Sequence, residues 1–198
     1  MTIEAEARET ELRALVGSGD LERATTETLR TYGPELVGWL RSILAEGDAQ
    51  DAFSRMSEDL WKSLVRFDGR CSLRTWCYML ARHAAARVRG QPSREREVLV
   101  SQIPSIQHAV TQIWSSTLRQ ERRSREVYAE IRATLDEEDQ TLLVLRVDRD
   151  LAWRDIAIVL LGEDADGDAV TKRAASLRKQ FERVKQRLRE LAAERLTD

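Results

Sequence analysis

The residues best suited to chemistry lie in one loop and in the helix expected after it. The loop carries an aromatic ring, a carboxylate and a guanidinium in the order Phe67, Asp68, Gly69, Arg70. The segment that follows, through Arg89, places apolar side chains at helical spacing and arginines mainly elsewhere. Aromatic rings stack on unpaired bases and basic side chains bind phosphates, so this combination favours binding of a nucleic acid. The alternative is a buried helix with a solvated arginine face, which is common.

A second basic segment lies near the C-terminus. A short apolar segment, 152–161, ends at Gly162 and is followed by an acidic turn and a long amphipathic segment. Helix, turn and basic helix is the order of a helix-turn-helix motif, whose second helix enters the major groove of DNA by its first turns. The alternative is an amphipathic helix used for packing or for a coiled coil. The side chains there that could reach base edges and phosphates are Thr171, Lys172, Arg173, Ser176, Arg178 and Lys179.

Periodicity and helix-capping residues predict an all-α fold with two helical domains. Ser72 and Asp136 are expected to cap helices, as are Asp48 and Asp168. The segment Tyr32-Gly33-Pro34 is expected to separate two helices. We expect helices over residues 4–16, 21–30, 34–45, 49–65, 73–89, 105–132, 152–161 and 169–193, and one after Asp136. The expected organisation is a lead-in (1–19), a four-helix bundle (20–90), a linker (91–132) and a helix-turn-helix domain (133–198).

Composition narrows the function classes. The 198 residues have a net charge of −2, but residues 66–96 hold eight arginines and residues 170–190 hold eight Lys or Arg, with acidic stretches elsewhere. Two separate basic segments indicate two places where a polyanion binds. The sequence has no run of eighteen apolar residues and opens on acidic, polar residues, which predicts neither a membrane span nor a signal peptide. Two cysteines and two distant histidines predict a cytoplasmic protein without a metal site or cofactor. No catalytic constellation is present, so we expect a protein that is not an enzyme.

Two segments carry a resemblance to a known family. The run YGPELVGWLRSIL, the helix ending in Leu60-Trp61, the FDGR loop and the run from Thr75 to Arg82 resemble the sigma-2 domain of extracytoplasmic-function (ECF) sigma factors, in the sigma-70 family. The segments TLDEEDQTLLVLRVDRDLAWRDIAIVLLG and AVTKRAASLRKQFERVKQRL resemble the sigma-4 domain. The resemblance implies a bacterial initiation factor that directs core RNA polymerase to promoters, melting the −10 element and binding the −35 element.

The resemblance also implies residue roles and partners. The −10 element would be bound by Phe67, Asp68, Arg70, Ser72, Arg74, Thr75, Arg82, Arg87 and Arg89, with Trp76 and Tyr78 in the core. The −35 element would be bound by Thr171, Lys172, Arg173, Ser176, Arg178 and Lys179. The clamp helices of the polymerase largest subunit would contact Asp51, Arg55, Glu58, Asp59 and Lys62. Further implied partners are the flap of the second-largest subunit and an anti-sigma factor, and residues 91–132 would thread the polymerase cleft.

The chain departs from the family pattern at several positions. Ser54-Arg55 replaces a usual Gln-Glu pair in the docking helix, and Ala152 replaces a capping Ser or Thr. His83 and Arg87 stand where Asn and Asp are usual. The sequence therefore predicts a divergent member. Two alternatives remain: a helix-turn-helix regulator that acts without polymerase, and a sigma-like protein-interaction module.

Overall fold

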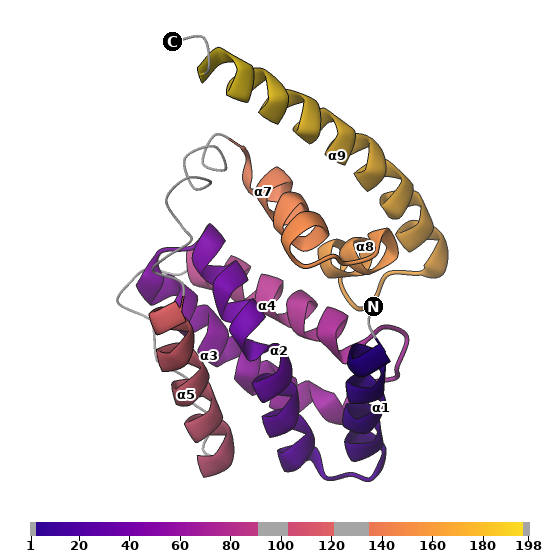
Figure 1. The fold of residues 1–198 in the computed structure, drawn as a ribbon. Coiled ribbons are helices and arrows are strands. Elements are labelled where there is room, and N and C mark those ends of the chain that lie inside the picture. The colour runs from indigo at the N-terminus through magenta and orange to yellow at the C-terminus, as the bar shows by residue number, and fades with distance from the viewer. Residues whose placement is uncertain (1–2, 91–102, 121–134, 196–198) are drawn as a thin grey trace. The chain divides into compact units, whose positions relative to one another are not determined.

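The computed structural model describes residues 3–90, 103–120 and 135–195, and the regular elements in these ranges are all helical, which confirms the all-α prediction (Figure 1). The chain divides into a first unit, residues 1–120, and a second unit, residues 121–198. Within the described residues, no helix is long and apolar enough to span a membrane.

In the residues of the first unit that the structure describes, five α-helices pack around one apolar core. They are α1 (Ile3–Gly17), α2 (Leu21–Ile43), α3 (Glu46–Ser63), α4 (Leu73–Gly90) and α5 (Pro104–Gln120), with a 3₁₀ turn at Leu64–Arg66 after α3. The core includes Trp39 of α2, Phe53 of α3 and Tyr78 of α4, none of which is exposed. The rings of Trp39 and Tyr78 meet edge to face with centroids 5.6 Å apart, which is a favoured aromatic geometry.

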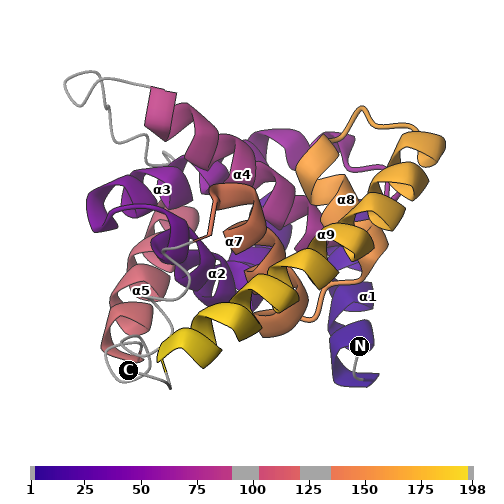
Figure 2. The same cartoon turned by 90° about the horizontal axis from the view of Figure 1, so that it is seen from above.

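The predicted break at Tyr32-Gly33-Pro34 is wrong, because α2 is one continuous helix with Pro34 inside it. Buried residues on both sides of the proline share one stripe, so a single helix can bury both halves. The proline itself is exposed. Gly33 faces inward, and a Cβ there would lie 2.9 Å from Cδ1 of Ile113 in α5. Glycine therefore permits the close approach of α5 to α2, which is visible in both views (Figures 1 and 2).

The first unit extends beyond residues 20–90 at both ends. Helix α1 lies in the predicted lead-in, and it packs on α2 and contacts α4. Helix α5 lies in the predicted linker and packs on α2 and α3 through buried Ile106, Ile113 and Trp114. The remaining predicted linker residues, 91–102 and 121–132, lie outside the described residues. The apolar faces of these two helices need a partner, and the first unit supplies it.

The second unit has a helix-turn-helix order. Its elements are α7 (Glu137–Leu143), a π-helical segment at Val144–Asp148, α8 (Trp153–Leu161) and α9 (Gly167–Arg195). Helices α7 and α8 both pack on α9, and the rings of Trp153 and Phe181 meet with centroids 5.4 Å apart. Gly162 ends α8 at a φ of 96°, which a residue with a Cβ rarely adopts.

The residues that cap the helices agree only in part with those predicted from the sequence. The carboxylate of Asp136 accepts from the N–H of Asp139 at 2.8 Å, as predicted. The predicted cap at Asp168 is wrong, because the carboxylate of Asp166 accepts from the N–H of Ala169 at 2.6 Å and α9 starts earlier, at Gly167. The predicted cap at Asp48 is also wrong. Helix α3 starts at Glu46, with Ala45 at the cap position and no side-chain cap bond, and Asp48 lies in the first turn.

Both cysteines are buried free thiols in the first unit. Burial raises the pKa of the Cys77 thiol well above its usual range, and the Glu35 and Glu9 carboxylates act in the same direction. Because the thiolate is the nucleophile, we expect Cys77 of the native chain to resist iodoacetamide at about pH 8, where a free thiol reacts. Peptide mass spectrometry before and after adding concentrated urea tests this, and rapid native labelling of Cys77 would contradict the packing of α4.

Candidate nucleic-acid interface

The aromatic loop, residues 67–72, joins the 3₁₀ turn to α4 and is held by its own polar groups. Asp68 accepts from the N–H of Arg70 at 3.1 Å and from Nε of Arg70 at 2.5 Å. The hydrogen bond from the Arg70 N–H is the main cause that lowers the pKa of the Asp68 carboxyl. Gly69 between them has a φ of 76°, in the left-handed region that favours glycine. Asp68 and Arg70 thus form one tight, exposed turn.

The start of α4 is capped as the sequence predicted. The hydroxyl of Ser72 accepts from the N–H of Thr75 at 3.0 Å. The two hydroxyls, Ser72 Oγ and Thr75 Oγ1, also lie 2.8 Å apart. Thr75 is buried, whereas Ser72 is half-buried. Ser72 therefore orients the first turn of α4 beside the aromatic loop.

Phe67 is half-buried and packs edge to face on Trp76, with ring centroids 5.5 Å apart. Trp76 and Tyr78 are both buried, as predicted. The indole N–H of Trp76 donates to the hydroxyl of Ser63 at 3.4 Å. Trp76 therefore supports Phe67 from the core, and Phe67 is the partly exposed ring of the loop.

Arg74 is engaged inside the first unit. Its Nε and Nη2 atoms donate to the two carboxylate oxygens of Glu35, each at 2.7 Å, and its guanidinium lies 5.9 Å from the centre of the Tyr78 ring. Burial is the largest single influence and lowers the pKa of the Arg74 guanidinium, but the hydrogen bonds and the charge of Glu35, with Tyr78 and Tyr32, together raise that pKa above its usual value. Glu35 was not among the predicted site residues. This two-bond geometry fixes Arg74 against α2.

The other arginines of α4 differ in their partners. Arg87 forms an ion pair with Asp59 of α3, and Nη2 of Arg89 donates to the carbonyl of Ile43 at 2.8 Å. Arg82 is half-buried, and its guanidinium has no ion-pair or hydrogen-bond partner among the residues that the structure describes. Of these three, Arg82 offers the guanidinium that no described neighbour neutralises.

The predicted polymerase-contacting side chains share α3. Lys62 pairs with Glu58 one turn away at 2.6 Å, and Asp59 pairs with Arg87. Asp51 and Arg55 are half-buried, and the Nε of Arg55 is buried without a hydrogen bond. This face therefore combines two paired carboxylates, Glu58 and Asp59, with a guanidinium whose Nε is buried without a hydrogen bond.

The predicted −35 residues lie in the first turns of α9. All but Arg173 are exposed. Arg173 pairs with Glu138 of α7 at 2.6 Å, and Thr171 donates its hydroxyl to the carbonyl of Gly167 at 2.8 Å. Ala152 starts α8 without a side-chain cap bond. The basic side chains left outward on this end of α9 are Lys172, Arg178 and Lys179.

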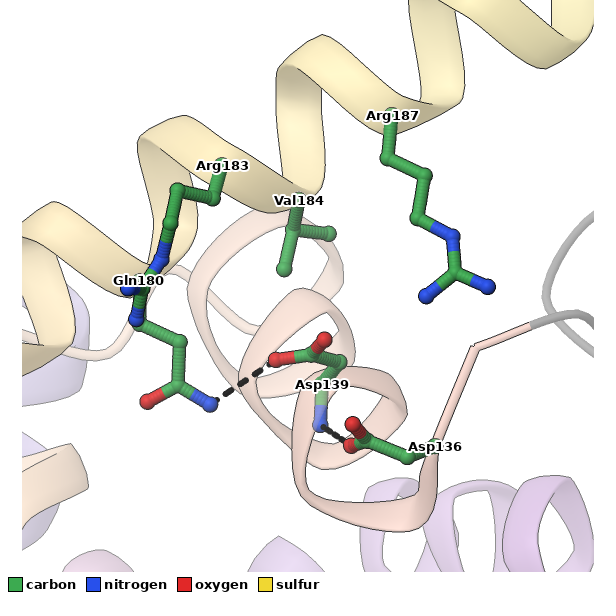
Figure 3. Close-up of a pocket in the computed structure, with 6 residues that line it drawn as sticks. All are labelled: Asp136, Asp139, Gln180, Arg183, Val184 and Arg187. Atoms are coloured by element: carbon green, nitrogen blue, oxygen red, sulfur yellow. Dashed lines mark hydrogen bonds between the residues drawn. The ribbon is translucent and has the colours of Figure 1, made fainter.

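A groove of about 280 Å³ lies between α7 and the middle of α9. Figure 3 shows Asp136 and Asp139 at the first turn of α7, facing side chains of α9, with Gln180 bonded to Asp139 at 2.8 Å. The full lining is Asp136, Asp139, Gln180, Arg183, Val184 and Arg187. Sequence patterns could not predict this groove, because it depends on how α9 crosses α7.

The aromatic loop and its neighbours correspond to a known domain family. Residues 28–93 match the family model of sigma-70 region 2. The match supports a sigma-70 family member. It covers a third of the chain, including the aromatic loop, α3, α4 and most of α2, and it leaves out α1 and the second unit. No curated protein and no solved structure matches the chain.

The match to sigma-70 region 2 indicates the general role of the first unit. A sigma-70 region 2 supports a sigma factor role in transcription initiation and implies interaction with core RNA polymerase. Sigma-70 factors are non-enzymatic transcription factors.

Proposed function

We propose that this chain is a divergent initiation factor of the ECF type, without enzymatic activity, that acts in the cytoplasm with core RNA polymerase. The observation that carries the proposal is the sigma-70 region 2 match over the aromatic loop and α4. The separate basic helix α9, preceded by α8 and a turn, supports a second DNA contact. A regulator that acts without polymerase has no need of the first feature.

In this proposal the second unit binds duplex DNA at the −35 element. Groove and phosphate contacts from the exposed face of α9 fix the register of the complex. The candidates are Lys172, Arg178 and Lys179, with Thr171, Arg173 and Ser176 beside them. The acidic turn before α9 repels phosphates, which confines the contact to the helix itself.

The first unit captures a −10 base that has left the stack. In this proposal Phe67, Asp68 and Arg70 of the aromatic loop contact the base, and Arg82 binds the strand backbone. Stacking and pocket contacts are worth about 1–3 kcal/mol per base, which is comparable with the cost of unstacking it. A few captured bases therefore bias the duplex toward the melted state without ATP.

The polymerase contacts in this proposal are the α3 face for the clamp helices and the second unit for the flap. An anti-sigma factor would compete for the same surfaces. The departures at Ser54-Arg55 alter the charge of the α3 face, so a polymerase matched to this chain is the appropriate partner for tests.

Run-off transcription with purified core polymerase and a genomic promoter library tests the proposal. We expect the full chain to bind core polymerase and to yield discrete transcripts that core polymerase alone does not give. Duplex DNA binding without core binding would contradict the sigma factor role and favour a regulator that acts alone. Core binding without promoter-specific transcripts would favour the interaction module.

A further inference from the structure

Helix α1 reaches the aromatic loop through Arg13. The Nη2 atom of Arg13 donates to the carbonyl of Cys71 at 2.7 Å, and Nη1 donates to the carbonyl of Gly69 at 3.4 Å. The same guanidinium lies 5.7 Å from the centre of the Phe67 ring. One side chain from α1 therefore contacts three positions of a loop that lies more than fifty residues along the chain.

Glu9, one turn before Arg13, joins the same site. Its carboxylate accepts from the N–H of Leu73, the first residue of α4, at 2.8 Å and from the hydroxyl of Tyr32 at 3.0 Å. It also pairs with Nε of Arg13 at 2.8 Å. Glu9 is buried, and burial together with this carboxylate raises the pKa of the Tyr32 phenol. A buried carboxylate with three donors is a strong, directional anchor.

Helix α1 is itself fixed to α2. Arg8 donates to the carboxylate of Glu27 at 2.7 Å and to the hydroxyl of Thr31 at 3.2 Å, and Leu12 is fully buried. Helix α1 lies outside the residues that match sigma-70 region 2. The anchor on the loop is therefore supplied by a segment next to the matched domain.

We infer that Glu9 and Arg13 are positioning residues for −10 capture: α1 holds the aromatic loop and the start of α4 in the shape that receives a base. The inference rests on the proposed function. Neither residue needs to touch DNA, because both act on the backbone of residues 69–73. A loop that is already ordered loses less entropy on binding, so the anchor increases affinity for the single strand.

A phosphate contact by Arg13 would give a different signature from positioning. A lost phosphate contact lowers both the affinity and the salt dependence of binding, because fewer counterions are released. A lost positioning contact lowers the affinity and leaves the salt dependence unchanged. Glu9 separates the two roles further, since removing a negative charge near DNA strengthens binding by electrostatics alone. Positioning predicts weaker binding for Glu9→Gln.

The test uses the full chain bound to core polymerase and a fluorescent single strand from the strongest promoter of the run-off assay. We expect Arg13→Ala and Glu9→Gln each to weaken binding about fivefold, the effect of about one typical hydrogen bond. The matched controls are Arg23→Ala and Glu6→Gln, which make the same charge changes at exposed positions away from the loop. We expect the controls to bind like the native chain.

A second measurement reports on the anchor itself. We expect the Leu73 amide hydrogen to exchange with solvent faster in the Arg13→Ala and Glu9→Gln variants (the anchor variants). The exchange of amides in the middle of α4 should be unchanged. Anchor variants that bind the strand like the native chain would overturn the inference and leave the proposed function intact. A smaller slope of log affinity against log salt concentration (the salt slope) for Arg13→Ala would also overturn it, in favour of a phosphate contact. If the native holoenzyme does not bind the strand, the proposed function fails and the inference fails with it.

Discussion

Replacing Arg74 with alanine is expected to lower the free energy of unfolding by about 2–3 kcal/mol, a loss of stability beyond any loss of DNA binding. The reason is the two-bond pair with Glu35, whose side chain is only 19% exposed. Without Arg74 that carboxylate has lost two donors and its partner charge in a mostly buried site. Chemical denaturation of the full chain, followed by amide exchange in α4, measures the loss.

Arg82 provides the matched control on the same helix. Because its guanidinium has no partner within the described part of the chain, Arg82→Ala is expected to leave stability within about 0.5 kcal/mol of the native value. The same variant should weaken single-strand binding and reduce its salt slope. The double variant Arg74→Leu with Glu35→Leu should recover most of the stability that Arg74→Ala loses, since it leaves no unpaired charge. Equal stability of the Arg74→Ala and Arg82→Ala variants would show that the pair with Glu35 contributes nothing.

The double variant Arg178→Ala with Lys179→Ala is expected to weaken duplex binding at least tenfold at low salt and to reduce the salt slope by about two. Both side chains are exposed on α9, and no neighbour among the described residues forms an ion pair with either of them. Filter binding of the full chain to promoter duplex over a range of salt concentrations measures both quantities.

Arg173 serves as the internal comparison for that experiment. Its guanidinium is already paired with Glu138, so Arg173→Ala should reduce the salt slope less than the loss of Arg178 does. Glu138→Gln should free Arg173 and strengthen duplex binding. Unchanged binding in the double variant would mean that the first turns of α9 do not contact DNA.

The sequence predicted the helices well because their apolar periodicity is strong. Trp76 falls on the inward stripe of α4 and is buried, and Tyr78, which the family resemblance placed in the core, is also buried. The break at Pro34 was wrong because local propensity was outweighed by a buried stripe that continues through it. The predicted cap at Asp168 failed because Asp166, two residues earlier, caps α9 instead, and local sequence does not determine which of two nearby acids caps. The predicted cap at Asp48 failed because α3 begins earlier, after Ala45, with no side-chain cap bond.

The candidate site was predictable in its residue types but not in its partners. The loop from Phe67 to Arg70 has recognisable aromatic, turn and basic residues. The anchor from Glu9 and Arg13 has no local signal, because it joins positions up to 64 residues apart. The pairing of Arg74 with Glu35 spans 39 residues and was missed for the same reason. Sequence patterns therefore identify which groups can bind DNA, and tertiary contacts decide which of them are available.

The ion pair between Asp59 and Arg87 has a consequence for cooperativity. It joins α3, the expected polymerase face, to α4, the expected DNA face. A partner that binds the Asp59 carboxylate releases the Arg87 guanidinium, and a phosphate that binds Arg87 releases Asp59. Two ligands that use these groups therefore assist each other, and thermodynamic linkage makes the effect equal in both directions. An exposed pair of this kind limits the coupling to about 1 kcal/mol, or roughly a fivefold change in either affinity.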